Sequence, residues 1–163
     1  MELSLFAIIL FLHVLGAIAA FGSSFTAFPA IGAAGGKEPM HGNFALRVTE
    51  TIANRVWILA LIQGVTGVLL IIVGSVDLTK ALWLDVAIVL YIGALAFSYF
   101  RQTPTLVKLI EMSSTPPPPP AAGAAPSGPP PAFMALVKQV QQGGMILGLL
   151  IVVIVFLMVT KPF

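Results

Sequence analysis

Hydrophobic residues are gathered in four long stretches of the chain, at about residues 3–28, 56–75, 81–99 and 143–160. A helix needs about 20 apolar residues to cross the hydrocarbon core of a bilayer, and all four stretches are close to that length. Because backbone amides in lipid must be hydrogen-bonded within their own segment, we predict that each stretch is a transmembrane helix. The first stretch is too long for the apolar core of a signal peptide, so we expect it to be retained.

Polar residues follow a helical spacing beside the second, third and fourth stretches, in residues 41–55, 102–112 and 133–142. We therefore expect these three helices to continue into water on one side of the membrane. The connection 76–80 is short, which predicts that the second and third helices are antiparallel neighbours. The predicted fold is all-α: a four-helix up-down-up-down transmembrane bundle with cytoplasmic helical extensions of helices 2–4.

A proline-rich segment separates the third and fourth stretches. Residues 116–131 read PPPPPAAGAAPSGPPP and show no hydrophobic periodicity. Runs of proline favour extended polyproline II structure, and the alanine, glycine and serine between them are flexible. We interpret the segment as a flexible cytoplasmic loop within a single transmembrane domain, residues 1–163. The alternative is a docking site for a partner that recognises proline-rich sequences.

The composition indicates a protein whose surface faces lipid. Hydrophobic residues make up 58% of the 163 residues, and charged residues make up only 9%. A soluble domain carries about 25% charged residues. Because so few charges could not cover so apolar a core, membrane lipid is the expected environment of most of the surface.

Basic residues decide the expected orientation, since cytoplasmic loops are enriched in lysine and arginine. Six of the eight basic residues lie in or beside the first and third loops, and two lie on the opposite side. The six are Lys37, Arg47, Arg55, Arg101, Lys108 and Lys138, and the two are Lys80 and Lys161. We therefore expect a multi-pass protein of the plasma membrane, with loops 29–55 and 100–142 in the cytoplasm and both termini extracytoplasmic.

Several function classes are disfavoured by what the sequence lacks. It contains no cysteine, which excludes disulfides, thiolate metal sites, cysteine nucleophiles and covalent c-type haem attachment. It has no nucleotide-binding loop, nucleophile elbow or zinc signature, so an enzyme of the soluble type is not expected. The net charge of +2 comes from few groups that form no basic stripe, and no nucleic-acid partner is expected.

Three polar side chains lie near the middle of their predicted spans: His13, Gln63 and Tyr91. Their similar depths would allow all three to meet at one level of the bundle, and polar groups inside a span are the first candidates for function. His13 could form an interhelical hydrogen bond with Gln63 or Tyr91, ligate the iron of a b-type haem, or contact a proton or a quinone. His41 lies in the first loop, about 30 Å from His13 along a helical chain, and cannot share one iron with it.

Small residues line one side of several predicted helices. The glycines of these faces are Gly16 on the first helix, Gly64 and Gly67 on the second, and Gly144 and Gly148 on the fourth. Small residues at helical spacing allow a second helix to approach closely. We interpret these positions as helix-packing faces, and the alternative is the close approach of a flat macrocycle.

At the cytoplasmic membrane boundary, Arg55 and Arg101 are expected to form a network with Glu50 and Gln142. Such a network would fix the helix ends, or it would hold an anionic lipid headgroup or a haem propionate. At the outer boundary, Asp85 is expected to join an interfacial charge cluster. The other members of that cluster are Asp77, Lys80 and Lys161, and the expected aromatic anchors are Trp57, Trp83 and Tyr99.

Two short motifs resemble those of a known family. FLHVLGAIAAFGSSFTAFP, residues 11–29, looks like the first helix of an uncharacterised family of predicted four-helix integral membrane proteins, and FLMVTKP, residues 156–162, resembles its usual end. That family resembles the copper-resistance D membrane proteins and the membrane haem-type protoporphyrinogen oxidase. The resemblance implies a b-haem ligand in the first helix, and only His13 carries over. Copper transport is poorly supported, because the spans hold no cysteine and no methionine pair.

These observations leave three functional hypotheses. The first is an accessory or structural subunit of a larger membrane complex, whose partners are other membrane proteins or further copies of the chain. The second is a b-type haem-binding redox protein with His13 as axial ligand. In that case Gln63, Tyr91, Arg55 and Arg101 would be further cofactor-binding residues. The third is a small transporter, although no repeated charged site or broken helix is seen in the sequence.

Overall fold

The computed structural model of the protein describes residues 4–37, 42–114 and 129–162. Within these residues the chain forms helices and turns, and no strand. The helices are α1 (Leu5–Phe25), α2 (Ala27–Lys37), α3 (Gly42–Val73), η2 (Leu78–Lys80), α4 (Leu82–Phe97), η3 (Ser98–Gln102), α5 (Thr103–Ser114) and α6 (Pro131–Thr160). The all-α prediction is confirmed for this part of the chain. Most of the proline-rich segment, and His41, lie outside the described residues.

Four helical segments of the described chain are long and apolar enough to cross a membrane. They are Leu5–Ala33, Gly42–Val73, Leu82–Ser114 and Pro131–Thr160, and they contain between 29 and 33 residues. The prediction of four apolar membrane helices is therefore confirmed. At about 1.5 Å per residue, each segment is longer than the roughly 30 Å of hydrocarbon that it has to cross.

The first segment contains a break that the hydrophobic pattern does not show. α1 ends at Phe25, and Thr26 leaves the helical conformation with φ −122° and ψ −61° before α2 begins. Pro29 lies in the first turn of α2, where a missing N–H costs little because no helical partner is available there. Helical structure therefore continues to Lys37, beyond the end that the hydrophobic pattern indicates at about residue 28.

The third segment stays helical through a local change of geometry. α4 continues into η3, a π-helical turn of five residues, and η3 continues into α5. Pro104 is the second residue of α5 and has no N–H to donate to the carbonyl group four residues before it. The wider π-helical turn lies directly before this proline, so the hydrogen-bond pattern is interrupted without ending the helix.

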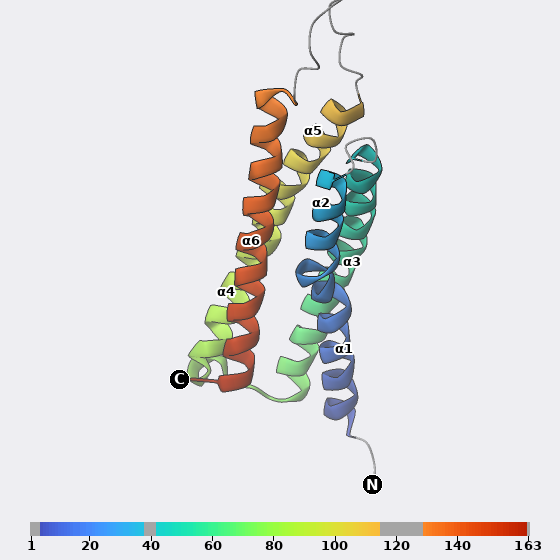
Figure 1. The fold of residues 1–163 in the computed structure, drawn as a ribbon. Helices are drawn as coiled ribbons and strands as arrows, with labels where there is room; N and C mark the ends of the chain where they lie inside the picture. The colour runs from blue at the N-terminus through green and yellow to red at the C-terminus, as the bar shows by residue number, and fades with distance from the viewer. Residues whose placement is uncertain (1–3, 38–41, 115–128, 163) are drawn as a thin grey trace, which may run out of the picture.

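The long helices pack in two pairs, and the short segment between α3 and α4 connects one pair to the other (Figure 1). α1 lies along α3, and α4 lies along α6. No Cα atom of α3 is within 8 Å of a Cα atom of α4, so the short connection between them does not make them closely packed neighbours. Away from the end where α1 begins and α6 ends, α5 packs against both α3 and α6, and α2 packs against α3. We call α2, residues 42–55 of α3, α5 and residues 131–142 of α6 the cap.

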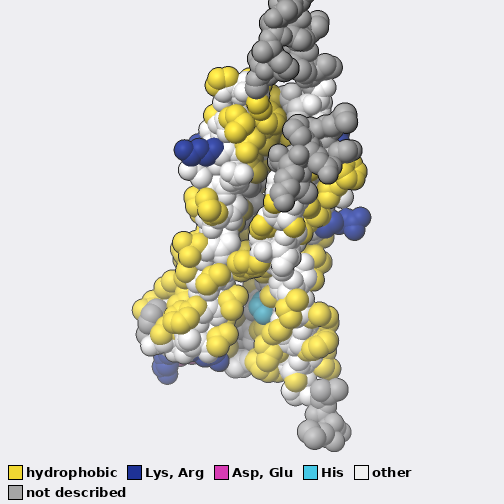
Figure 2. All heavy atoms as spheres, in the orientation of Figure 1, with side chains coloured by type: hydrophobic (Ala, Val, Ile, Leu, Met, Phe, Trp, Pro, Cys, Tyr) yellow, Lys and Arg dark blue, Asp and Glu magenta, His cyan; other side chains and the backbone are white. Residues whose placement is uncertain are grey.

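Three of the five large apolar side chains that are buried in the described chain lie in the cap. Leu109 of α5 is 1% exposed, and Leu106 and Ile110 beside it are 6% and 7% exposed. Elsewhere the buried apolar residues are mostly small: Ala20, Ala60, Ala81, Leu84, Ala87 and Leu157. Many large apolar side chains of the spans are exposed, and hydrophobic groups cover much of the face shown in Figure 2. Such an arrangement suits helices surrounded by lipid, which pack through small residues.

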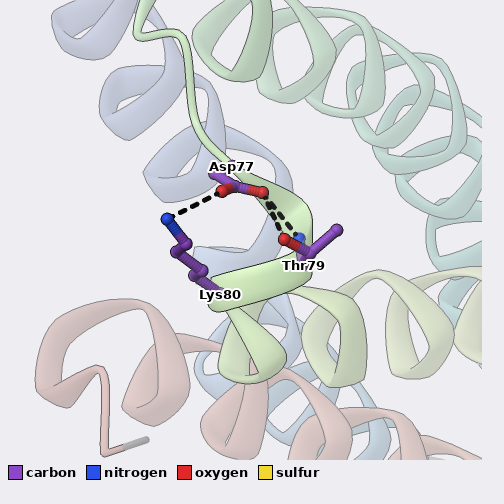
Figure 3. Close-up of polar contacts among 3 residues, drawn as sticks. All are labelled: Asp77, Thr79 and Lys80. Carbon is purple, nitrogen blue, oxygen red and sulfur yellow. Dashed lines mark hydrogen bonds and ion pairs between the residues drawn. The ribbon is translucent and has the colours of Figure 1, made fainter.

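A short hydrogen-bonded turn joins α3 to α4 (Figure 3). Oδ1 of Asp77 accepts hydrogen bonds from the Thr79 hydroxyl at 2.6 Å and from the Thr79 backbone N–H at 3.1 Å. Its Oδ2 lies 3.5 Å from Nζ of Lys80. The hydrogen bond from the Thr79 hydroxyl, followed by that from the N–H, holds the pKa of Asp77 below its ordinary value because both stabilise the charged carboxylate.

Candidate functional site

His13 of α1 faces α3 and is held there by a hydrogen bond. Its Nδ1 lies 2.9 Å from Oγ1 of Thr66. The Thr66 hydroxyl also lies 3.1 Å from the carbonyl oxygen of Ile62 and 3.0 Å from that of Gln63, and its single hydrogen is donated to these carbonyls. With that hydrogen assigned to a carbonyl, Oγ1 of Thr66 accepts from the Nδ1–H of His13, and this tautomer has a lone pair on Nε2 of the imidazole.

Gln63 lies about one turn from Thr66 on α3 and faces the same helix, α1. A Cβ atom added to Gly16 would be 2.8 Å from Oε1 of Gln63, which is closer than Cβ atoms approach oxygen in proteins. Gln63 is 8% exposed, and its Oε1 is buried and accepts no hydrogen bond from the described residues. The contact between α1 and α3 thus depends on a glycine opposite the amide group.

Tyr91 of α4 reaches α3 on a second side of that helix. Its hydroxyl donates a hydrogen bond to the carbonyl oxygen of Ala60 at 2.6 Å. A Cβ atom added to Gly64 would be 2.8 Å from this hydroxyl oxygen. Since the backbones of α3 and α4 stay apart, the tyrosine side chain spans the distance between the two helix pairs.

The three polar residues that the sequence places near the midplane therefore all make their contacts at one stretch of α3, residues 60–67. Gln63 belongs to this stretch, and His13 and Tyr91 reach it from α1 and α4. The hydrogen-bond partner of His13 is Thr66, and neither Gln63 nor Tyr91. The sequence interpretation misses Thr66, because a threonine that bonds its own helix carbonyls can lie inside a span without a marked cost. The signal that could have found it is its position three residues after Gln63, on the same face of the helix.

Two further glycines of the predicted packing faces also meet side chains of this chain. A Cβ atom added to Gly67 would be 3.4 Å from Cε1 of His13, and one added to Gly148 would be 3.9 Å from the ring of Phe25. A Cβ atom added to Gly144 would meet no neighbouring heavy atom within 4 Å. Helix packing accounts for the first two glycines, whereas Gly144 lies on the exposed side of α6.

Residues 7–162 match the model of a family described as "Predicted integral membrane protein (DUF2269)". The chain belongs to this family. Together with the four candidate spans, this membership establishes a multi-pass integral membrane protein. No curated protein and no solved structure gives a match to the chain.

The charged residues at the cap end of this membrane protein do not form the expected network. In the described part of the chain, no hydrogen bond or ion pair joins Glu50, Arg55, Arg101 and Gln142 to one another. Arg55, Arg101 and Gln142 are exposed. The residue that links α6 to the preceding segment is Gln102, whose Nε2 donates to the carbonyl oxygen of Val140 at 3.0 Å.

At the opposite end of the bundle the expected charge cluster is not formed, and its members make two separate contacts. Lys80 pairs with Asp77, and Nζ of Lys161 lies 5.5 Å from the centroid of the Trp83 ring. Asp85, in the first turn of α4, is half-buried and joins neither contact. At the other boundary, the rings of the expected anchors Trp57 and Tyr99 are stacked at 6.0 Å.

The described residues contain no group of three or more histidine, cysteine, aspartate or glutamate side chains that could hold a metal ion. A metal at the midplane would have to rely on Nε2 of His13, which has no partner within the described chain. The site can therefore supply one imidazole ligand, and its other groups serve contacts between helices.

Proposed function

We propose that this protein is an accessory, structural subunit of a larger complex in the plasma membrane. The observation that carries the proposal is that His13, Gln63 and Tyr91 are all directed at α3 or α1, each against a glycine. A transporter needs polar groups along a passage, and an enzyme needs reactive groups that converge on a cavity. Here the polar side chains lie at contacts between helices of the same chain, so the outer surface is what the protein offers to other membrane proteins or to further copies.

The proposed topology is an up-down-up-down bundle with the cap in the cytoplasm and both termini outside. Arg47, Arg55, Lys108 and Lys138 lie on helices of the cap, whereas Lys80 and Lys161 lie at the opposite end. The buried leucines of α5 also favour a cap in water, because burial of large apolar side chains stabilises a protein in water and not in lipid. A reporter fused to the C-terminus should be active only outside the cytoplasm, and activity confined to the cytoplasm would overturn this topology.

Purification from the membranes of its own cells in a mild detergent tests the subunit role. We expect a particle clearly larger than one 17.1 kDa chain in detergent, with partner chains or further copies in a fixed ratio. Cross-linking before solubilisation should capture the same assembly. A folded, stable monomer without partners in several mild detergents and without cross-links would contradict the proposal.

A second candidate is b-type haem binding, which the state of His13 favours. The hydrogen bond from Nδ1–H to Thr66 orients the imidazole and leaves Nε2 available, an arrangement typical of histidines that bind iron. The resemblance to the membrane haem-type protoporphyrinogen oxidase supports the same residue, and the resemblance to the copper-resistance D proteins adds no further ligand. The described residues fit one axial ligand of a haem, and the opposite ligand would have to come from elsewhere.

An absorption spectrum of the purified protein tests the second candidate. A haem-binding protein would show a Soret band that is lost in His13→Ala. In Thr66→Val the band should persist but shift, because the imidazole loses the acceptor for its Nδ1–H. A colourless wild-type protein that is correctly folded would exclude this candidate.

A further inference from the structure

The cap end of α3 carries a shallow, open and mainly apolar surface depression, lined by residues of this helix alone, which we call the groove. The groove has a volume of about 330 Å³ and is lined by Phe44, Arg47, Val48, Thr51 and Ile52. Phe44 is 69% exposed. The Thr51 hydroxyl donates to the carbonyl oxygen of Arg47 at 2.9 Å, so its hydrogen is not available to a ligand. The polar group that remains in the lining is the guanidinium group of Arg47.

Arg47 is oriented by neutral partners and keeps several donors free. Its Nε donates to Oδ1 of Asn43 at 3.0 Å, and its Nη2 lies 3.4 Å from Oγ of Ser114. Asn43 is fixed in turn, because its Nδ2 donates to the hydroxyls of Ser113 and Ser114 at 2.8 and 2.9 Å. A guanidinium group has five N–H donors, so three have no partner within the described chain. A positioned arginine without a carboxylate partner is well suited to bind an anionic group.

Arg55 extends the same face of α3 toward the membrane. It lies four residues after Thr51 and eight after Arg47, which places it on the groove side, about 12 Å from Arg47 along the helix axis. It is exposed and makes no hydrogen bond or ion pair with the described residues. Arg47 in the groove and Arg55 beyond it are therefore separated along this face by Val48, Thr51 and Ile52.

The position of the groove argues against acyl chains as its occupant. The apolar part of α3 begins at Val56, and the lining residues precede it by about 6 to 18 Å along the axis. Acyl chains stay within the hydrocarbon core, so they do not reach this height. In the proposed topology the groove lies in water, and an apolar groove in water with an exposed phenylalanine is typical of a surface that binds another protein.

We propose that the groove binds an acidic amphipathic helix of a partner subunit. Phe44, Val48 and Ile52 follow one another at intervals of four residues, the row on which the apolar face of a second helix packs. Two carboxylates of the bound helix, about two turns apart, would pair with Arg47 and Arg55, since two turns rise about 11 Å. This inference rests on the proposed role as a subunit and names the surface that the role would use.

Charge reversal in the full-length protein, expressed in its own cells, tests the inference. The variant Arg47→Glu/Arg55→Glu is compared with Lys108→Glu/Lys138→Glu, which reverses two other exposed charges of the cap. The first variant should lower the fraction of protein found in the complex by about ten-fold or more, and the second should leave it unchanged. An equal loss in both variants would show an effect of net charge and would overturn the inference.

Arg47 also forms a hydrogen bond from α3 to Ser114 of α5, so the double variant could lose assembly through misfolding. Two single variants test the groove without this effect. Arg55 is exposed and makes no hydrogen bond or ion pair with the described residues, and Phe44 is exposed, so Arg55→Glu and Phe44→Ala should keep the thermal midpoint of the wild type. Each should still lower the fraction in the complex by several-fold. If these variants assemble like the wild type, the groove is not the docking site although the subunit role stands. If the wild type itself forms no complex, the subunit role fails independently.

A photo-reactive residue at position 51 identifies the occupant directly. We expect a cross-link to one segment of a partner chain that has a helical apolar repeat and carboxylates seven or eight residues apart. The same residue at position 108 is the control and should not give this product. Cross-links to phospholipid alone, or to a basic segment, would overturn the inference.

Discussion

Replacement of Gly64 by alanine tests whether the contact between the two helix pairs depends on the close approach of Tyr91. The added Cβ atom would be 2.8 Å from the Tyr91 hydroxyl oxygen, and 3.3 and 3.4 Å from Cε1 and Cζ of the ring. A tyrosine ring is rigid, so the side chain as a whole has to move. The hydrogen bond to the carbonyl oxygen of Ala60, at 2.6 Å, would then be lost.

Three contributions determine the size of the effect of Gly64→Ala. Loss of the hydrogen bond costs about 1 kcal/mol. Crowding in a close-packed contact costs about 1–3 kcal/mol. Alanine in place of glycine inside a helix contributes about 1 kcal/mol in the favourable direction. We therefore expect the variant to lower the free energy of unfolding by about 1–3 kcal/mol.

Two further variants separate this contact from the general effect of alanine. A Cβ atom added to Gly93 of α4 meets no heavy atom within 4 Å, so Gly93→Ala should be neutral or stabilise the protein by up to about 1 kcal/mol. In a Tyr91→Phe background the hydroxyl oxygen is absent, and Gly64→Ala should be nearly neutral. The double-mutant cycle should therefore give a coupling energy of about 1–3 kcal/mol between positions 64 and 91.

The measurement is reversible unfolding of the purified protein in detergent, followed by circular dichroism during titration with a denaturing detergent. All variants must start from the same helical content. If Gly64→Ala is as stable as Gly93→Ala, or if Tyr91→Phe does not reduce its cost, the described contact does not stabilise the protein and the reasoning is refuted.

Two further predictions concern the ends of the bundle. A Cβ atom added to Gly143 would overlap Oε1 of Gln102 and lie 2.9 Å from its Cδ, whereas one added to Gly144 meets no neighbouring atom within 4 Å. Gly143→Ala should therefore be less stable than Gly144→Ala by about 1–3 kcal/mol in the same unfolding assay. Equal stabilities would contradict this packing. Because the Thr79 hydrogen bonds lower the pKa of Asp77, their stabilising effect is present above the ordinary value of 3.8 and is lost as pH falls through the lowered pKa. Asp77→Asn should flatten the acid side of a plot of thermal midpoint against pH, and an unchanged slope below pH 3.8 would argue against this role.

The spans could be predicted from the sequence because each depends on a local property, the length of an apolar run. The similar heights of His13, Gln63 and Tyr91 along their helices could be estimated for the same reason, since height follows from counting residues along a helix. The structure accordingly brings all three near one stretch of α3, residues 60–67. Helix rotation and register are not local properties, because they depend on which faces pack together.

The choice of partners therefore could not be obtained from the sequence. Thr66 binds His13 because the rotation of α1 against α3 places Gly67 under the imidazole ring, and Gly67 and Thr66 are neighbours in the chain. The break at Thr26 was missed for a related reason. The run of apolar residues continues across it to about residue 28, and Pro29, which follows that run, is compatible with a helix start as well as with an end.

The glycines and the polar or aromatic side chains of the bundle occur in pairs that link different helices. The pairs are Gly16 with Gln63, Gly64 with Tyr91, Gly67 with His13 and Gly143 with Gln102. Helices in lipid gain little from burial of apolar surface against one another, so close packing and hydrogen bonds have to supply their association. Because the glycines of these four pairs face side chains of the same chain, they are not available to partners, which have to bind to the outer surface of the spans or to the cap. In the proposed topology the cap lies in water. Exposure of the apolar side chains of the groove to water then carries a free-energy cost, which binding of a partner would remove.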